Sequence, residues 1–162
     1  MEKFNEIYTD LDEYQKLTPW QLHNKGIDPD KQSRDKLNSD WLIRDIGGFF
    51  QYYPVELFQR SKTEQSAVTT TIVLLRFKAD KGNFPDNLNE LITAGFLKEL
   101  PQDPYNEGTL TYKRVGESFI LYSLGPNFKD DGGQAFRDNK GRIEMWSDEG
   151  DTVFWPVEKV NK

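Results

Sequence analysis

The hydrophobic pattern of this chain changes its period part-way along, and this change limits the folds that it can adopt. From Pro54 to about Asp80 the apolar residues recur at helical steps, and they form a stripe of Phe58, Val68, Ile72, Leu75 and Ala79. From Thr109 to Leu124 apolar and polar residues alternate, which is typical of strands. A long helix followed by a β-hairpin predicts an α+β domain.

The residues between and after these elements predict how they are joined. Gly82 ends the long helix, and "NFPDNLNELITAGF" predicts a short helix with an apolar face of Leu88, Leu91 and Ile92 and a C-cap at Gly95. The turn "GES" joins two strands, Thr109–Val115 and Phe119–Leu124. A loop of about twenty residues follows, in which "GRIEM" predicts a short strand. The segment "TVFWPV" predicts a final strand, and its Pro156 suits the edge of a sheet.

The first part of the chain predicts additional helices. Thr18, Pro19 and Trp20 provide an N-cap followed by proline at the first helical position. Further apolar residues at helical spacing precede Gly47-Gly48, and the aromatic cluster "FFQYYP" comes next. We therefore expect a helical extension over residues 1–53 and a globular domain over residues 54–162, with a long helix packed on a small antiparallel sheet.

Composition excludes several classes of function. The net charge of −6 argues against a broad nucleic-acid interface, which needs clustered Lys and Arg. The chain has no cysteine and a single histidine, His23, so thiolate zinc sites and sites with several histidines are excluded. No stretch approaches the roughly 18 apolar residues of a membrane helix. We expect no membrane span in this chain, and attachment to a membrane through a segment upstream of it.

Four short segments, in order, resemble the globular domain of the major pseudopilin of type II secretion. They are "KGNFP" (Lys81 to Pro85), "FLKELPQDPYN" (Phe96 to Asn106), "LYSLGPNF" (Leu121 to Phe128) and "DTVFW" (Asp151 to Trp155). The match covers about residues 60–157. The chain is also similar to the soluble C-terminal domains of uncharacterised bacterial membrane proteins that carry "GPDGKDDGG"-type loops.

The resemblance implies a pilin-like fold and a non-enzymatic, extracytoplasmic protein of the cell envelope with protein partners there. The chain departs from the family in lacking the apolar N-terminal helix that stacks subunits in a fibre. Residues 1–60 replace or precede that helix with a different helical segment. The departure argues against polymerisation of this chain.

The resemblance also implies calcium binding by the acidic loop. Calcium takes six to eight oxygen ligands from carboxylates, carbonyls and water. In this sequence the expected ligands are the backbone carbonyl of Leu124, the side chains of Asn127, Asp130 and Asp131, and Asp151 of the closing motif. Asn127 replaces an aspartate of the family, which keeps an oxygen but loses a charge. The alternative is a metal-free loop in which Asp and Asn serve as turn residues.

A different class of function uses the aromatic cluster. If Phe49, Phe50, Tyr52 and Tyr53 line one exposed groove, the chain is a glycan- or peptide-binding module; otherwise they pack the N-terminal segment onto the domain. An enzymatic role would need an acid placed beside a nucleophile or a second acid, and no such pair is indicated by the sequence. We therefore predict that the chain is not an enzyme.

Overall fold

The computed structural model describes residues 53–156 and, before them, residues 6, 9–10, 12–29, 31–32 and 35. The chain divides into two compact units, residues 1–61 and residues 62–162, and the division falls within one long helix. In the first unit, helix α2 (Pro19–Asn24) begins as its sequence predicts. The Thr18 hydroxyl accepts the Gln21 N–H at 3.2 Å, and the Gln21 side chain accepts the Thr18 N–H at 2.9 Å, which forms a capping box.

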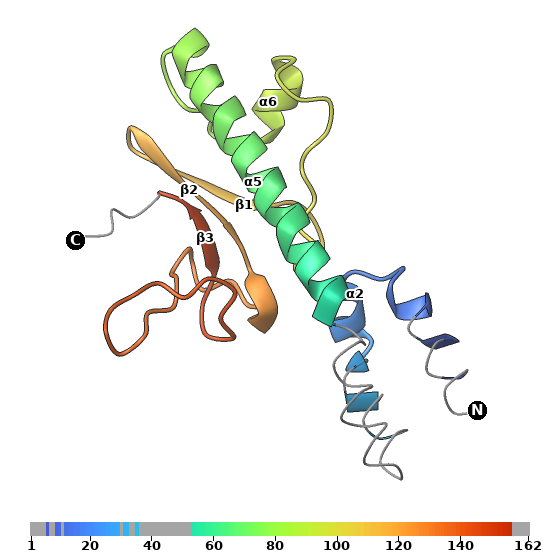
Figure 1. Ribbon diagram of the computed structural model, residues 1–162. Coiled ribbons are helices and arrows are strands. Elements are labelled where there is room, and N and C mark those ends of the chain that lie inside the picture. The colour runs from blue at the N-terminus through green and yellow to red at the C-terminus, as the bar shows by residue number, and fades with distance from the viewer. Residues whose placement is uncertain are drawn as a thin grey trace. The chain divides into compact units, whose positions relative to one another are not determined.

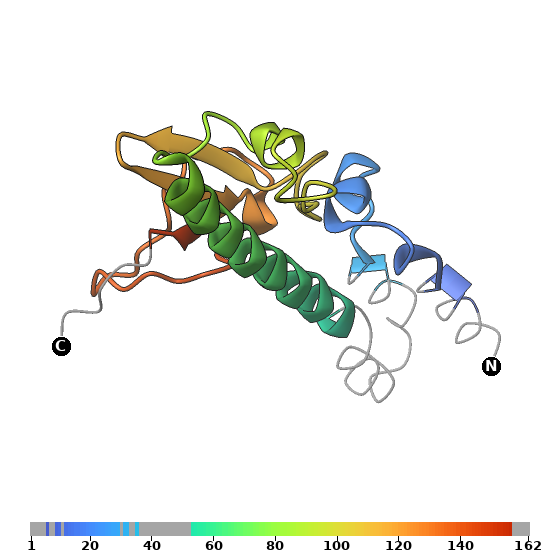
Figure 2. The same ribbon diagram turned by 90° about the horizontal axis from the view of Figure 1, so that it is seen from above.

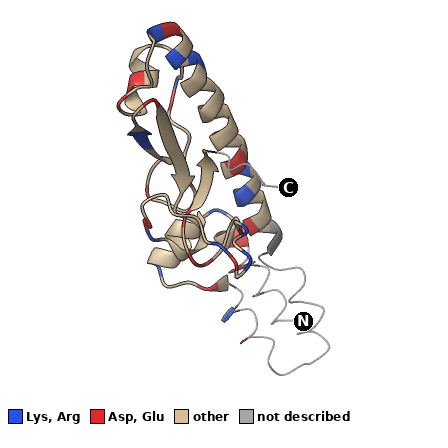
Figure 3. Cartoon of the chain, turned by 90° about the vertical axis from the view of Figure 1, so that its left-hand side faces the viewer, with Lys and Arg blue, Asp and Glu red and all other residues tan. Residues whose placement is uncertain are grey.

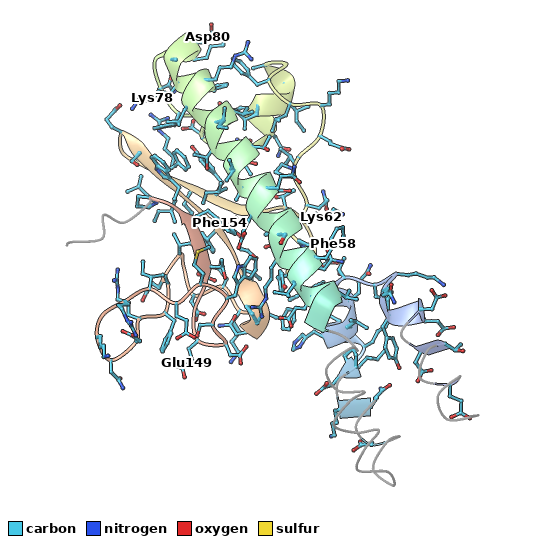
Figure 4. All side chains as sticks on the ribbon, viewed as in Figure 1. Phe58, Lys62, Lys78, Asp80, Glu149 and Phe154 are labelled. Atoms are coloured by element: carbon cyan, nitrogen blue, oxygen red, sulfur yellow. The ribbon has the colours of Figure 1, made fainter. Side chains whose placement is uncertain are left out.

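The long helix, α5 (Tyr53–Lys81), confirms the helix predicted from Pro54 to about Asp80 (Figure 1). Its β-branched stretch "AVTTTIVLL" is helical throughout. Lys78 and Asp80 mark its C-terminal end (Figure 4), after which Gly82 adopts a positive φ of 86° that favours glycine. Helix α6 (Asn89–Thr93) follows, and the N–H groups of Gly95 and Phe96 close its end on the carbonyls of Ile92 and Leu91.

The apolar stripe that predicted α5 lies on its outer side. Val68, Ile72 and Leu75 are 60%, 61% and 43% exposed, and Phe58 and Ala79 are exposed as well. The buried side is formed by Thr63, Ala67, Thr70, Leu74 and Phe77. Threonine can face the core here because the Thr70 hydroxyl donates to the Ser66 carbonyl of its own helix at 2.7 Å. No charged residue occurs between Glu64 and Arg76, so the middle of α5 is uncharged in Figure 3.

The sheet has three antiparallel strands in the order β1–β2–β3. Strand β1 (Thr111–Val115) and β2 (Ser118–Ser123) form the predicted hairpin, whose turn is Gly116-Glu117. Strand β3 (Thr152–Trp155) confirms the predicted final strand, and it pairs with β2 at the edge of the sheet. The predicted strand at "GRIEM" is wrong: the described chain has only an isolated bridge there, between Arg137 and Ile143.

One face of the sheet packs on the two helices. The core joins Ala67, Leu74 and Phe77 of α5 and Leu91 of α6 to Phe119 and Leu121 of β2. Figure 2 shows α5 running along one side of the sheet, and Figure 4 shows Phe154 of β3 on the side toward α5. The outcome is an α+β arrangement of one long helix on a small antiparallel sheet.

Candidate functional site

The acidic loop that links β2 to β3, residues 124–151, packs on part of the second face of the sheet. Side chains alternate along a strand, so Ile120 and Tyr122 point away from the face that holds Phe119 and Leu121. A Cβ at Gly133 would lie 2.9 Å from Ile120 Cγ2 and 3.3 Å from the Tyr122 ring. The loop backbone therefore lies directly on this face, and Gly133, with a φ of 86°, allows this close approach.

The loop begins with a short helical turn. The 3₁₀ helix η1 (Gly125–Asn127) follows Leu124, which is buried, and Phe128 ends it in the left-handed conformation with a φ of 57°. The Asn127 side-chain oxygen accepts the Lys129 N–H at 2.9 Å, and the Asn127 amide nitrogen donates to the Asp131 carboxylate at 2.9 Å. Asn127 and Asp131, which were both expected as calcium ligands, are joined by a direct hydrogen bond.

Asp151 closes the loop at its other end. Its carboxylate accepts the Asp131 N–H at 3.3 Å and the Gly133 N–H at 2.7 Å, and its own N–H donates to the Gln134 carbonyl at 2.8 Å. The residue is only 3% exposed. Burial raises the pKa of this carboxyl group, and the two backbone N–H bonds act in the opposite direction. The predicted return of Asp151 onto the loop is present, and its role there is to hold the loop backbone.

Asp130 connects the loop to the sheet. It accepts the Tyr122 hydroxyl at 2.7 Å and the Gly132 N–H at 2.9 Å, and Lys113 Nζ lies 3.9 Å away. The bond from Tyr122 lowers the pKa of Asp130, whereas burial raises the pKa of the Tyr122 hydroxyl. The pair therefore stays a neutral phenol donating to a carboxylate, which favours attachment of the loop over acid–base chemistry.

A buried carboxylate in the connector before β1, which the sequence did not single out, is linked by hydrogen bonds to the start of the acidic loop. Asp103, in the connector before β1, is 2% exposed; it accepts the Ser123 hydroxyl at 2.8 Å and the Tyr105 N–H at 3.0 Å. The Ser123 oxygen in turn accepts the Gly125 N–H at 3.2 Å. This chain of bonds joins "QDPYN" to "LYSLGP", two of the segments that carry the family resemblance. The Asp-Pro turn in the sequence was the signal that could have identified it.

Burial raises the pKa of Asp103 to about 6, and the donors Tyr105, Ser123 and Leu124 only partly oppose this effect. The other carboxylate oxygen of Asp103, Oδ2, has no hydrogen-bond partner. Because the folded pKa lies above the unfolded value of 3.8, the protonated form favours folding. This stabilisation is complete below the unfolded pKa and is lost as the pH rises through about 6.

We expect this linkage to be measurable as a difference between the wild type and Asp103→Asn. A shift of about two pKa units corresponds to about 3 kcal/mol, so the wild type should lose about 2–3 kcal/mol relative to the variant between about pH 4 and pH 7. Urea unfolding of both proteins across this range measures the difference. Asp148→Asn, at an exposed position of the acidic loop, is the control. A difference that stays constant with pH would contradict the assignment.

A second group of aromatic residues, Tyr105, Phe128 and Trp146, holds the acidic loop, and Trp146 attaches the later part of the loop to α5. The Trp146 indole N–H donates to the Glu64 carboxylate at 2.8 Å. The Trp146 ring lies 5.1 Å from that of buried Tyr105, and Phe128 stacks on Tyr105 at 6.1 Å, between ring centroids. Trp146 and Phe128 are the two non-glycine residues with positive φ in the described part of the chain. Both strained residues therefore hold aromatic side chains against the same tyrosine.

The tip of the loop is a small exposed turn. The Asp138 carboxylate accepts the N–H groups of Lys140 and Arg142 at 2.8 and 2.9 Å and the Arg142 side chain at 2.7 Å. The Asp138 N–H donates to the Arg142 carbonyl, and the Glu144 N–H to the Phe136 carbonyl. All of these bonds lie within residues 136–144.

The aromatic side chains predicted to line a binding groove fall outside the part of the chain that the structure describes. Phe49, Phe50 and Tyr52 are outside the described residues, and so is the side chain of Tyr53, the first residue of α5. Within the described ranges, no three His, Asp or Glu side chains are gathered in a way that could hold a metal ion. In the same ranges, no helix has the length and apolar character needed to cross a membrane.

Comparisons of the chain with models of protein families, with curated proteins and with solved structures find no match.

Proposed function

We propose that this chain is a non-enzymatic, pseudopilin-like domain of a protein of the cell envelope. The observation that carries the proposal is the way its characteristic segments meet. The segment "QDPYN" bonds to "LYSLGP" through Asp103 and Ser123, and "DTVFW" returns Asp151 to the loop that follows "LYSLGP". These segments resemble the pseudopilin family in sequence and occur in the same order. Direct contacts between them favour one shared structural role.

The chemistry of the loop supports a structural role over a catalytic one. Asp103, Asp130 and Asp151 each accept hydrogen bonds from backbone N–H or hydroxyl groups. These bonds fix the loop backbone and its attachment to the sheet. A catalytic acid pair would instead place two carboxyl groups on either side of a substrate site.

The outer side of α5 supports a role in assembly with other proteins. Val68, Ile72 and Leu75 expose apolar surface on a stretch of helix that has no charge. Exposed apolar surface of this kind often marks protein contacts. The proposal therefore includes protein partners in the envelope.

Fractionation of the source cells tests the proposal. A short tag on the chromosomal copy should be recovered with the envelope and should be digested by protease added to spheroplasts. A cytoplasmic protein expressed from the same locus with the same tag is the control for lysis. Recovery of the tagged protein in the cytoplasmic fraction, protected from added protease, would contradict the proposed location.

A further inference from the structure

The resemblance implies a calcium ion in the acidic loop. The structure shows which hydrogen-bond donors face the expected calcium ligands. A bound cation needs oxygen lone pairs directed toward it. The two oxygens of Asp151 are instead approached by the N–H groups of Asp131 and Gly133. Each N–H directs its positive end at the carboxylate, so these donors provide part of the compensation that a cation would otherwise give.

At Asn127, too, a hydrogen bond within the chain takes the place of a cation. Its oxygen accepts the Lys129 N–H, and this bond orients the amide so that its nitrogen faces Asp131. The Asn127 nitrogen lies 2.9 Å from an Asp131 carboxylate oxygen. An aspartate at position 127 would place two carboxylates together, and their repulsion favours a cation or a proton between them. The asparagine replaces that requirement with an N–H donor.

Asp130 also has its donors within the chain. The oxygen of its carboxylate that faces the sheet accepts both the Tyr122 hydroxyl and the Gly132 N–H, and the Lys113 ammonium lies near the same oxygen. The Lys113 ammonium also lies 5.2 Å from the centre of the Tyr122 ring. The positive charge beside Asp130 therefore comes from the protein.

We infer that the acidic loop is closed by N–H, O–H and ammonium donors of the chain itself, so that it keeps its fold without a bound cation. Asparagine at position 127 provides the N–H donor that an aspartate there would lack, and this donor makes the closure self-sufficient. The inference concerns the purified chain and does not depend on where the protein works. Its failure can therefore be distinguished from failure of the proposed location.

Thermal unfolding of the purified 162-residue chain, in millimolar calcium chloride and in excess EGTA, tests the inference. The wild type should have the same Tm in both conditions to within about 1 °C. Asn127→Asp should lower the Tm in EGTA by about 2–4 °C, the shift expected for about 1 kcal/mol in a chain of 162 residues. Calcium should restore much of that loss in the variant, because the new carboxylate pair can share the ion.

Asn139→Asp is the matched control, since it adds the same charge at the exposed tip of the same loop. It should leave the Tm close to that of the wild type, with and without calcium. Two results would overturn the inference. One is a wild-type Tm that rises by several degrees in calcium and falls in EGTA. The other is an Asn127→Asp variant as stable in EGTA as the wild type.

Discussion

Replacing Phe119 with alanine should lower the free energy of unfolding by about 3–5 kcal/mol, the usual cost of removing a buried aromatic ring. Phe119 is 1% exposed and lies where the hairpin, the connector after α5 and the last strand meet. Its ring centroid is 4.9 Å from that of Phe84, 5.3 Å from Trp155 and 5.8 Å from Tyr112. The loss would therefore weaken contacts to three separate segments.

Urea unfolding monitored by circular dichroism measures this cost. Val115→Ala, in the neighbouring strand, is the control because Val115 is 53% exposed and its truncation should change stability by at most about 0.5 kcal/mol. Phe119→Leu should fall between the two. If Phe119→Ala costs less than about 1 kcal/mol, the described packing of the helices on the hairpin is wrong.

Replacing Asp151 with alanine should destabilise the protein by about 2–4 kcal/mol and release the acidic loop. The substitution removes the acceptor of two backbone N–H groups, and hydrogen bonds to a charged group contribute about 1.5–3 kcal/mol each. The cost of burying the carboxylate offsets part of that contribution. The N–H groups of Asp131 and Gly133 would then lack their partner. We expect the free energy to fall equally in calcium and in EGTA.

Limited proteolysis measures the local part of this effect. Cleavage between residues 128 and 150 should increase more in Asp151→Ala, relative to the wild type, than cleavage in the rest of the domain. Asp148→Ala, at an exposed position three residues away, should behave as the wild type. Equal cleavage of the loop in all three proteins would show that Asp151 does not hold it.

The sequence was most informative where local patterns determine local structure. The hairpin followed from alternation and from a glycine in its turn, and α5 from its length and its helical spacing. The side of α5 that faces the sheet could not be predicted in this way. Hydropathy favours Val68, Ile72 and Leu75 for the core, but the buried side includes Thr63 and Thr70. A threonine hydroxyl that bonds within its own helix is buried at little cost, and spacing alone does not reveal that bond.

The acidic loop shows the same limit for a candidate site. The resemblance brought Asn127, Asp131 and Asp151 together, and the structure does place them near one another. The sequence could not show that the partners of these residues include N–H groups, because a backbone donor has no signature in a sequence. Asp103 and Tyr122 were missed for a related reason. Their roles depend on contacts with Ser123 and Asp130 across 20 and 8 residues, and such contacts exist only once the sheet has formed.

The turn at Asp138 is hydrogen-bonded within itself, between residues 136 and 144, and its side chains are largely exposed to solvent. It is a self-contained turn, since the bonds that hold the loop to the sheet lie at Asp130 and Asp151 on either side of it. A peptide inserted between Asn139 and Lys140 would lengthen this turn and leave the bonds of Asp130 and Asp151 in place. The domain thus offers an internal position for an epitope or a fluorophore, between Asp130 and Asp151.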